Sequence, residues 1–279
     1  MRSPARLPTP ESRGRRARGW STALTGLPAV GGAVFLVLLV LPMLSLVIRL
    51  PPGDWLSRLG QPLIVQALRL SLETSIVSTM AVTILGLPLA HLLAMRQFPG
   101  KRLLEVLIDL PMVLPPTVAG VGLLLAFGRA GTLGRALSAL GVTIPFTTLA
   151  VILAQMFVAG PFLVNSARAG FEEVDTKYLR AAATLRASPA YTFLRIVLPL
   201  SLPSLVAGAA MTWARALGEF GATITFAGNF PGRTQTMPLA VYAALQSDVD
   251  AAVALSVMLL LVSAGLLLTL RTVSAAPRR

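Results

Sequence analysis

Residues 171–198 read FEEVDTKYLRAAATLRASPAYTFLRIVL, a polar stretch between two long apolar segments of an otherwise hydrophobic chain. Its charged side chains are too costly to place in hydrocarbon; they are Glu172, Glu173, Asp175, Lys177, Arg180, Arg186 and Arg195. We therefore expect the stretch to face water on one side of a membrane. The small side chains of the three alanines at its centre, 181–183, predict a helix that can approach another surface closely.

The composition of the chain is typical of a helical membrane protein. Of its 279 residues, 55% are hydrophobic and 13% are charged, and the mean hydropathy is +0.76. A soluble domain carries about 25% charged residues. Apolar runs of about 18 residues or more recur along the chain, which favours spanning helices over the strands of a membrane barrel. The predicted fold class is all-α and polytopic.

Six transmembrane helices are predicted, each close to the roughly 20 residues that cross a bilayer. They cover residues 27–49, 67–94, 106–128, 146–168, 197–217 and 250–271. The third is interrupted by the segment LPPTVAG, in which the Pro115–Pro116 pair breaks the helix and leaves Thr117 near mid-membrane. Broken helices are tolerated at that depth where they face protein or a water-filled path. We therefore assign Pro115, Pro116 and Thr117 to a translocation path.

A single membrane domain is expected over residues 26–272, between a disordered basic tail at 1–25 and a short tail at 273–279. The apolar run after the first tail exceeds a signal-peptide core and lacks a cleavage site, so it is interpreted as a retained span. Arg and Lys are concentrated in the tails, in the loop at 95–105 and in the polar stretch. The positive-inside rule then places both termini and the polar stretch in the cytosol. The net charge of +13 indicates contact with lipid headgroups, not with nucleic acid.

The sequence gives little support to an enzyme. Cysteine is absent, and the one histidine, His91, lies near the end of the second predicted span, where an interfacial structural role is expected. Neither a phosphate-binding loop nor a nucleophile elbow occurs. We predict no catalytic residue, no metal site and no cofactor on this chain, so any use of ATP requires a separate subunit.

The segment that runs from Tyr178 to Gly208 resembles the cytoplasmic loop of the permeases of binding-protein-dependent ABC importers. The motif of that family is Glu-Ala-Ala, three residues, Gly, about nine residues and Ile-x-Leu-Pro, and it is matched here by Ala181, Ala182, Ile196, Leu198 and Pro199. The resemblance implies a short helix that docks on an ATP-binding subunit. The residues assigned to this coupling loop are Asp175, Arg180, Ala181, Ala182, Ala183, Leu185, Arg186, Ala187, Ser188 and Pro189.

The coupling loop departs from the family motif at two positions. Arg180 stands where the motif has Glu, and Arg186 stands where it has Gly. Glycine permits a left-handed turn that arginine resists, so we expect a different turn at Arg186 and a partner surface with acidic groups. Ala182 is expected in the docking face, where a glutamate would prevent association with the ATPase.

A second resemblance concerns the cargo. Residues 215–246 read RALGEFGATITFAGNFPGRTQTMPLAVYAALQ and are similar to the molybdate permease subunits of the same family. Sulfate permeases share the segments 218–221 and 228–232, whereas 222–226 and 234–239 favour the molybdate branch. Together with LPMVLPPTVAGVGLLLAFGRAG in the third span and with the coupling loop, these matches extend the resemblance over about residues 65–271, which leaves the N-terminal tail outside it.

The start of this region can form an outer gate. Arg215 and Glu219 are four residues apart, so they share a helical face near the outer end of the fifth span and can pair. We assign both to the gate, together with Phe220 and Gly221; a purely structural ion pair is the alternative. The GNFPG turn is expected to precede a short helix at 239–245.

The resemblance implies a homodimeric permease in the lipid bilayer of the plasma (inner) membrane. Its partners would be a dimer of ATP-binding cassette subunits, which carry ATP and Mg, and an extracytoplasmic molybdate-binding protein. Tungstate and sulfate or thiosulfate are alternative cargoes. An ion-coupled secondary transporter would need acids at mid-span, but its candidates Glu73 and Asp109 lie nearer to span ends. A structural scaffold is disfavoured by the LPP break and the coupling loop.

Overall fold

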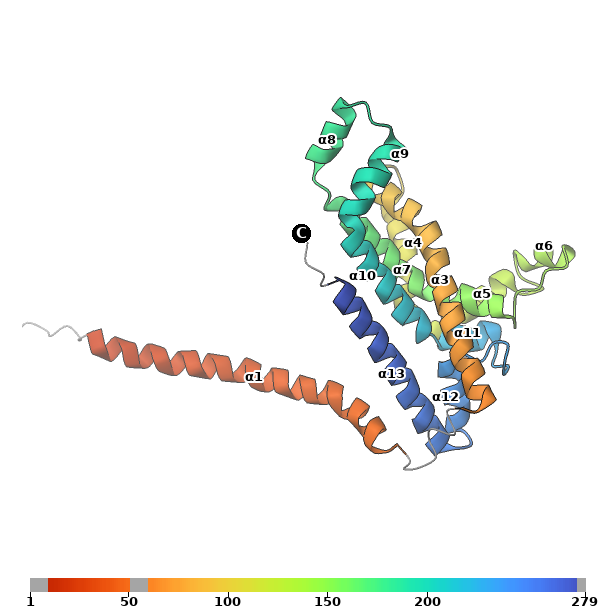
Figure 1. Cartoon of the computed structure of the whole chain (residues 1–279), viewed down its shortest axis with the longest axis horizontal. Coiled ribbons are helices and arrows are strands. Elements are labelled where there is room, and N and C mark those ends of the chain that lie inside the picture. Colours follow the sequence, from red (N-terminus) through yellow and green to blue (C-terminus); the bar gives the residue numbers. More distant parts are fainter. Residues whose placement is uncertain (1–9, 51–59, 275–279) are drawn as a thin grey trace, which may run out of the picture. The chain divides into compact units, whose positions relative to one another are not determined.

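The computed structural model describes residues 10–50 and 60–274. Over this part of the chain every regular element is helical (Figure 1), which confirms the all-α fold class. The chain divides into two units, Met1–Leu50 and Pro51–Arg279. Five described helices are long and apolar enough to cross a membrane, and a sixth crossing results if one bent pair of helices counts as a span.

The first unit contains helix α1, Pro10–Ile48. Its apolar part, Pro28–Ile48, corresponds to the first predicted span. The helix begins well inside the stretch 1–25, which the sequence predicts to be a disordered tail; residues 1–9 lie outside the described residues. Proline is tolerated in the first turn of a helix, and the following run is rich in arginine, a good helix former, without another proline before Pro28.

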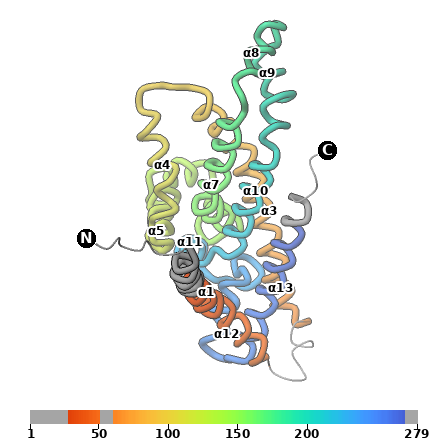
Figure 2. The backbone as a smooth tube through the Cα atoms, turned by 90° about the vertical axis from the view of Figure 1, so that its left-hand side faces the viewer, coloured from red at the N-terminus to blue at the C-terminus, as the bar shows by residue number. Residues whose placement is uncertain are grey.

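The second unit is built around four long helices, α3 (Pro62–Met95), α7 (Thr148–Glu172), α10 (Leu198–Leu217) and α13 (Val249–Ser274). The shorter elements are α4 (Lys101–Val113), α5 (Pro116–Phe127), α6 (Gly134–Ala139), α8 (Thr176–Thr184), α9 (Pro189–Thr192), the π-helix η1 (Phe193–Val197), α11 (Gly221–Ala227) and α12 (Met237–Leu245). Helix α7 packs against both α3 and α10. Figures 1 and 2 show α8 and α9 at one end of these long helices and α12 toward the other.

The predicted third span is broken. The chain changes direction by 118° between helices α4 and α5. Leu114 and Pro115 at the junction have extended backbones, with ψ angles of 136° and 130°. A residue before proline is forced out of the helical region, and here two prolines follow Leu114 in succession. The break predicted at LPP within the span 106–128 is therefore confirmed, and the two halves of the span are α4 and α5.

Small residues allow α10 to lie against α7. The hydroxyl of Ser201 donates a hydrogen bond of 2.8 Å to the carbonyl oxygen of Gly170. A Cβ atom at Gly170 would lie 2.5 Å from Cβ of Ser204, and one at Gly208 would lie 2.6 Å from Cβ of Ser166. Both distances are shorter than van der Waals contact, so the two backbones approach as closely as they do only because these residues are glycines.

Replacing Gly208 by alanine should destabilise the protein by about 1–3 kcal/mol, because the added methyl group must push α10 away from α7. Gly265→Ala is the matched control, since a Cβ atom there meets no atom within 4 Å. Thermal unfolding of the purified variants in detergent should give a lower Tm for Gly208→Ala alone. Equal Tm values would contradict the close packing.

Candidate gate and coupling loop

The broken helix brings the predicted gate residues together. Helix α5 crosses α11, and a Cβ atom at Gly221 would lie 2.6 Å from Cβ of Pro116 and 3.3 Å from the backbone nitrogen of Thr117. On the other side of the contact, a Cβ atom at Gly120 would lie 2.6 Å from Cβ of Thr225. Each helix thus contributes one glycine to the α5–α11 crossing. Two segments about 100 residues apart in the sequence meet there with almost no space between their backbones.

Glu219 anchors the start of α11. Its side chain is 1% exposed, and Oε2 lies 2.7 Å from Nη1 of Arg215, so the predicted pair is confirmed. Its other carboxylate oxygen, Oε1, accepts a hydrogen bond of 2.8 Å from the backbone N–H of Ala222. A carboxylate at the beginning of a helix satisfies amide groups that have no partner within the helix. The same side chain therefore ties the end of α10 to the start of α11.

An aromatic pair lies at the junction between α10 and α11. The ring of Phe220 lies 5.1 Å from that of Tyr242 in α12, centroid to centroid.

Beyond α11 the chain reverses at Gly228, whose φ angle is 74°, and α12 then begins at Met237. This confirms the GNFPG turn and the short helix expected at 239–245. Phe226 is fully buried in an apolar cluster with Ala119 and Leu123 of α5 and with residues of α7.

The coupling loop, residues 175–189, forms a helix and a tight turn beyond the end of α7. The carboxylate of Asp175 caps α8 by accepting a hydrogen bond of 2.9 Å from the backbone N–H of Lys177. That hydrogen bond and the Lys177 ammonium group beside it hold the pKa of Asp175 below its ordinary value. Ser188 caps α9 in the same way, with its hydroxyl accepting from the N–H of Tyr191.

The turn after α8 corrects the sequence-based expectation for Arg186. Arg186 adopts the left-handed conformation, with a φ angle of 54°. Its N–H donates to the carbonyl of Ala183 and that of Ala187 donates to the carbonyl of Ala182, both at 3.0 Å. These two bonds define a Schellman motif, the helix ending in which glycine is preferred. Arginine therefore makes the turn expected of the motif's glycine, at a conformational cost of about 1–2 kcal/mol.

The structure also differs from the sequence-based expectation in which side chains of the coupling loop are buried and which are exposed. Ala182 is 4% exposed and faces its own chain, so it is not in the outward face where the sequence placed it. Leu185, by contrast, is 82% exposed, and Tyr178 is exposed as well. Leu185 is therefore the most exposed large apolar side chain of the loop, and such a side chain gains most when it leaves water.

The coupling loop continues into α10 through a π-helix. Residues Phe193–Val197 form five-residue turns between α9 and α10. The ring of Phe193 lies 4.5 Å from that of His91 near the end of α3, and His91 also contacts Phe171 of α7. π-Helical turns occur frequently at functional sites, where they alter the direction of a helix. His91 thus packs at the point where three helices meet the loop.

A buried polar seam between the long helices escaped the sequence analysis. Ser78 donates to Oε1 of Gln155 at 2.9 Å, and Nε2 of Gln155 donates to the hydroxyl of Thr74 at 3.2 Å. Next to Thr74 in the same helix, the hydroxyl of Ser75 accepts a hydrogen bond of 2.9 Å from Nε1 of Trp213. The seam joins α3, α7 and α10. Its signal in the sequence is SLETSIVST, in which hydroxyl residues recur at helical spacing within an apolar span.

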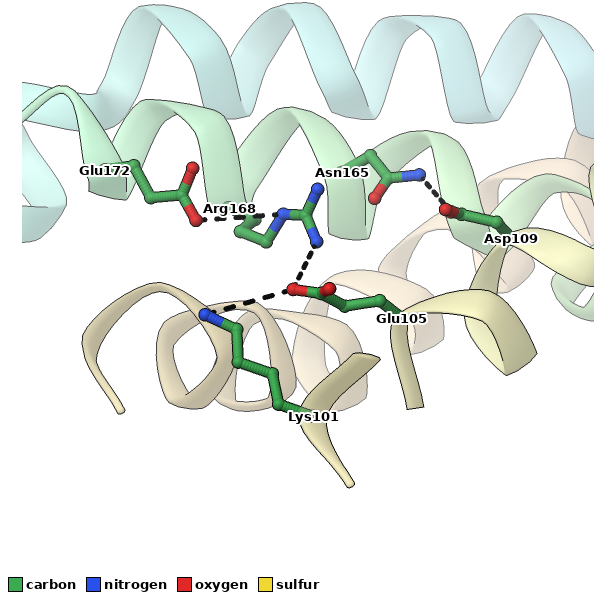
Figure 3. A network of polar contacts seen from close by, with 6 residues as sticks. All are labelled: Lys101, Glu105, Asp109, Asn165, Arg168 and Glu172. Atoms are coloured by element: carbon green, nitrogen blue, oxygen red, sulfur yellow. Dashed lines mark hydrogen bonds and ion pairs between the residues drawn. The ribbon is translucent and has the colours of Figure 1, made fainter. Parts of the chain in front are cut away.

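The acids considered for ion coupling have partners in the structure. Figure 3 shows Asp109 accepting a hydrogen bond of 2.6 Å from the amide of Asn165. Beside it, Glu105 lies 2.9 Å from Arg168 and so links α4 to α7. Glu73 pairs with Arg69 at 2.6 Å on the exposed side of α3. Glu105 and Arg168 therefore hold the first half of the broken span against the long helices.

These features define a polytopic protein with a broken helix beside its long helices and a capped loop at one end. The model of the family described as "Binding-protein-dependent transport system inner membrane component" matches residues 83–276. The molybdenum transport system permease protein ModB of Mycobacterium tuberculosis is 44% identical over 238 residues, 85% of this chain and 89% of that protein. The sulfate transport system permease protein CysT of Escherichia coli is 35% identical over 243 residues, 86% and 88% of the two chains.

A solved structure shares the fold. It is that of a bacterial ABC transporter involved in the import of the acidic polysaccharide alginate, with a TM-score of 0.73 and 16% sequence identity, over 95% of this chain and 98% of that one. The family model covers more than half of the sequence. The chain belongs to the family of inner membrane components of binding-protein-dependent transport systems.

Replacing Glu219 by alanine should destabilise the protein by about 3 kcal/mol, because it leaves Arg215 without its partner and the Ala222 amide without its acceptor. Glu219→Gln keeps an oxygen for Ala222 and should lose less. Thermal unfolding in detergent compares the two variants with the unaltered protein. A Glu219→Ala variant that unfolds at the unaltered temperature would show that the pair holds nothing in place.

Proposed function

We propose that this chain is the molybdate-translocating subunit of an ATP-driven importer. The cargo rests on the 44% identity to a molybdenum permease over most of both chains. The observation that carries the mechanism is the path of α10. Helix α10 begins directly after the π-helix that follows the coupling loop, and it ends at Leu217. In its last turn Arg215 pairs with the buried carboxylate of Glu219, two residues beyond the end of the helix. One rigid element therefore connects the loop with the α5–α11 crossing.

Movement at the coupling loop would reach the gate through this helix. An ATPase that draws the loop sideways would displace the start of α10, and Glu219 would transfer that displacement to α11. Because Gly221 packs against Pro116 without room for a Cβ atom, a movement of α11 must either separate it from α5 or displace α5 as well. The α5–α11 crossing is therefore suited to open and close a path. Pro115, Pro116, Thr117 and Phe220 are the further residues that we assign to it.

The crossing suits a divalent tetrahedral anion that must bind weakly. Thr117 places an exposed hydroxyl group on α5, whereas Thr223 is buried and the hydroxyl of Thr225 donates to the carbonyl oxygen of Gly221 within α11. Neutral O–H and N–H donors can replace part of the hydration shell of an oxyanion without the permanent attraction of a buried cation. A fixed cationic cage would hold the anion too tightly for release.

The remaining assignments complete the transporter. Two copies of the chain would form one path, with residues 26–272 as the membrane domain, both termini in the cytosol and the gate outside. The ATP and Mg would be held by a pair of ATP-binding subunits, and cargo would be delivered by an extracytoplasmic binding protein. Binding-protein dependence is the property for which the family is described.

Proteoliposomes that contain this chain, its ATPase and the molybdate-loaded binding protein should take up molybdate only when ATP is present. Sulfate at equal concentration should compete weakly. Uptake that persists without the ATPase would overturn the ATP-driven mechanism. Equal competition by sulfate would favour the alternative cargo, which the 35% identity to a sulfate permease supports.

Replacing Leu185 by aspartate should weaken co-purification of the ATPase about tenfold or more, because burying a leucine side chain contributes about 1.5–3 kcal/mol. Leu140→Asp is the matched control, because Leu140 is also exposed (78%). It lies in the loop between α6 and α7, at the opposite end of α7 from α8, so the same substitution there should leave the association with the ATPase unchanged. If the Leu185→Asp variant still co-purifies with the ATPase as well as the unaltered protein does, Leu185 is not part of the docking face.

A further inference from the structure

A cavity of about 550 Å³ lies beside the α5–α11 crossing. Its walls come from three segments: the end of α5, the loop before α7 and the loop between α11 and α12. The lining includes Leu124, Gly128, Arg129, Thr143, Phe146 and Arg233. Since α7 begins just after this loop and leads to α8 at its far end, the cavity and the coupling loop lie at opposite ends of α7.

Two uncompensated positive charges face this cavity. Arg129 and Arg233 both line it, and none of the lining residues is an acid. In the described part of the chain, the guanidinium group of neither arginine has an ion pair or hydrogen bond, whereas Nε of the neighbouring Arg135 donates to the carbonyl of Ala130. Arginine stays charged at every physiological pH. Two such charges at one cavity favour an anion there.

The walls of the cavity are built to hold a fixed shape. Phe146 has a φ angle of 62°, a left-handed conformation that is rare for a bulky residue. Its ring packs edge-to-face on that of Phe230 at 6.2 Å, and its N–H donates to the carbonyl of Phe226 at 3.4 Å. The hydroxyl of Thr148, at the start of α7, donates to the carbonyl of Arg233 at 2.9 Å. Strain of this kind persists only where surrounding contacts enforce it, and it is concentrated at functional sites.

We propose that the Arg129–Arg233 cavity is an entry site for a tetrahedral oxyanion, occupied before the anion passes the α5–α11 crossing. This inference rests on the proposed function for the direction of transport. The planar donor fork of each guanidinium matches an oxyanion edge, and two forks from separate loops can hold two edges of one tetrahedron. Both arginines are exposed to water, so their charges are screened and the site binds weakly enough to release its anion.

Calorimetric titration of sodium molybdate into the full-length protein in nanodiscs tests this site without the rest of the transporter. The unaltered protein and the control Arg135→Gln should bind saturably, and the Arg129→Gln/Arg233→Gln double variant should bind at least tenfold more weakly. Replacing both residues by lysine keeps the charges but removes the forks, so it should give an intermediate affinity. Added sodium chloride should weaken binding by the unaltered protein.

The entry site would be overturned by the absence of saturable binding by the unaltered protein, or by an unchanged affinity for molybdate in the double variant. If a double variant with unchanged affinity also loses the binding protein, the arginines belong to a docking surface instead. Uptake of molybdate in proteoliposomes distinguishes failure of the entry site from failure of the proposed function. Normal uptake by the double variant would contradict the entry site but not the proposed function.

Discussion

The close approach of α10 to α7 is the contact on which the rest of the structure depends. Within a membrane, lipid tails are as apolar as leucine, so helices gain little from burying large side chains against each other. Gly170 and Gly208 instead let Ser201, Ser204 and Ser166 fill the space between the two backbones. The buried seam of Thr74, Ser78 and Gln155 adds directed hydrogen bonds between α7 and α3. This three-helix frame fixes the position of both ends of α10.

Each end of α10 is linked to a different kind of element. At one end, the π-helix joins it to a loop whose turns are fixed by Asp175, Ser188 and the Schellman motif. At the other end, Glu219 joins it to α11, and α11 meets α5 through glycine and proline without intervening side chains. The Arg215–Glu219 pair is therefore structural. A gating role would follow from the hydrogen bond between Glu219 and Ala222, because a displacement of Glu219 would also displace the start of α11.

Local patterns in the sequence predicted the features that depend on residues close together in the chain. The LPP break, the Arg215–Glu219 pair and the GNFPG turn followed from proline geometry, helical spacing and turn chemistry. Contacts between distant segments could not be predicted, because helical periodicity gives the face of a helix but not its neighbour. The bond of Gln155 to Thr74 spans 81 positions, and Arg129 and Arg233 share a cavity although 104 positions separate them (233 minus 129).

The error at Arg186 has an energetic cause. Arginine disfavours a positive φ angle by about 1–2 kcal/mol, which argued for another turn. The turn, however, provides partners for the carbonyls of Ala182 and Ala183 at the end of α8, and each net hydrogen bond contributes about 0.5–1.5 kcal/mol. Two such bonds offset the backbone cost without help from glycine. The arginine side chain is then exposed next to Leu185, where an acidic group on a partner would complement its charge.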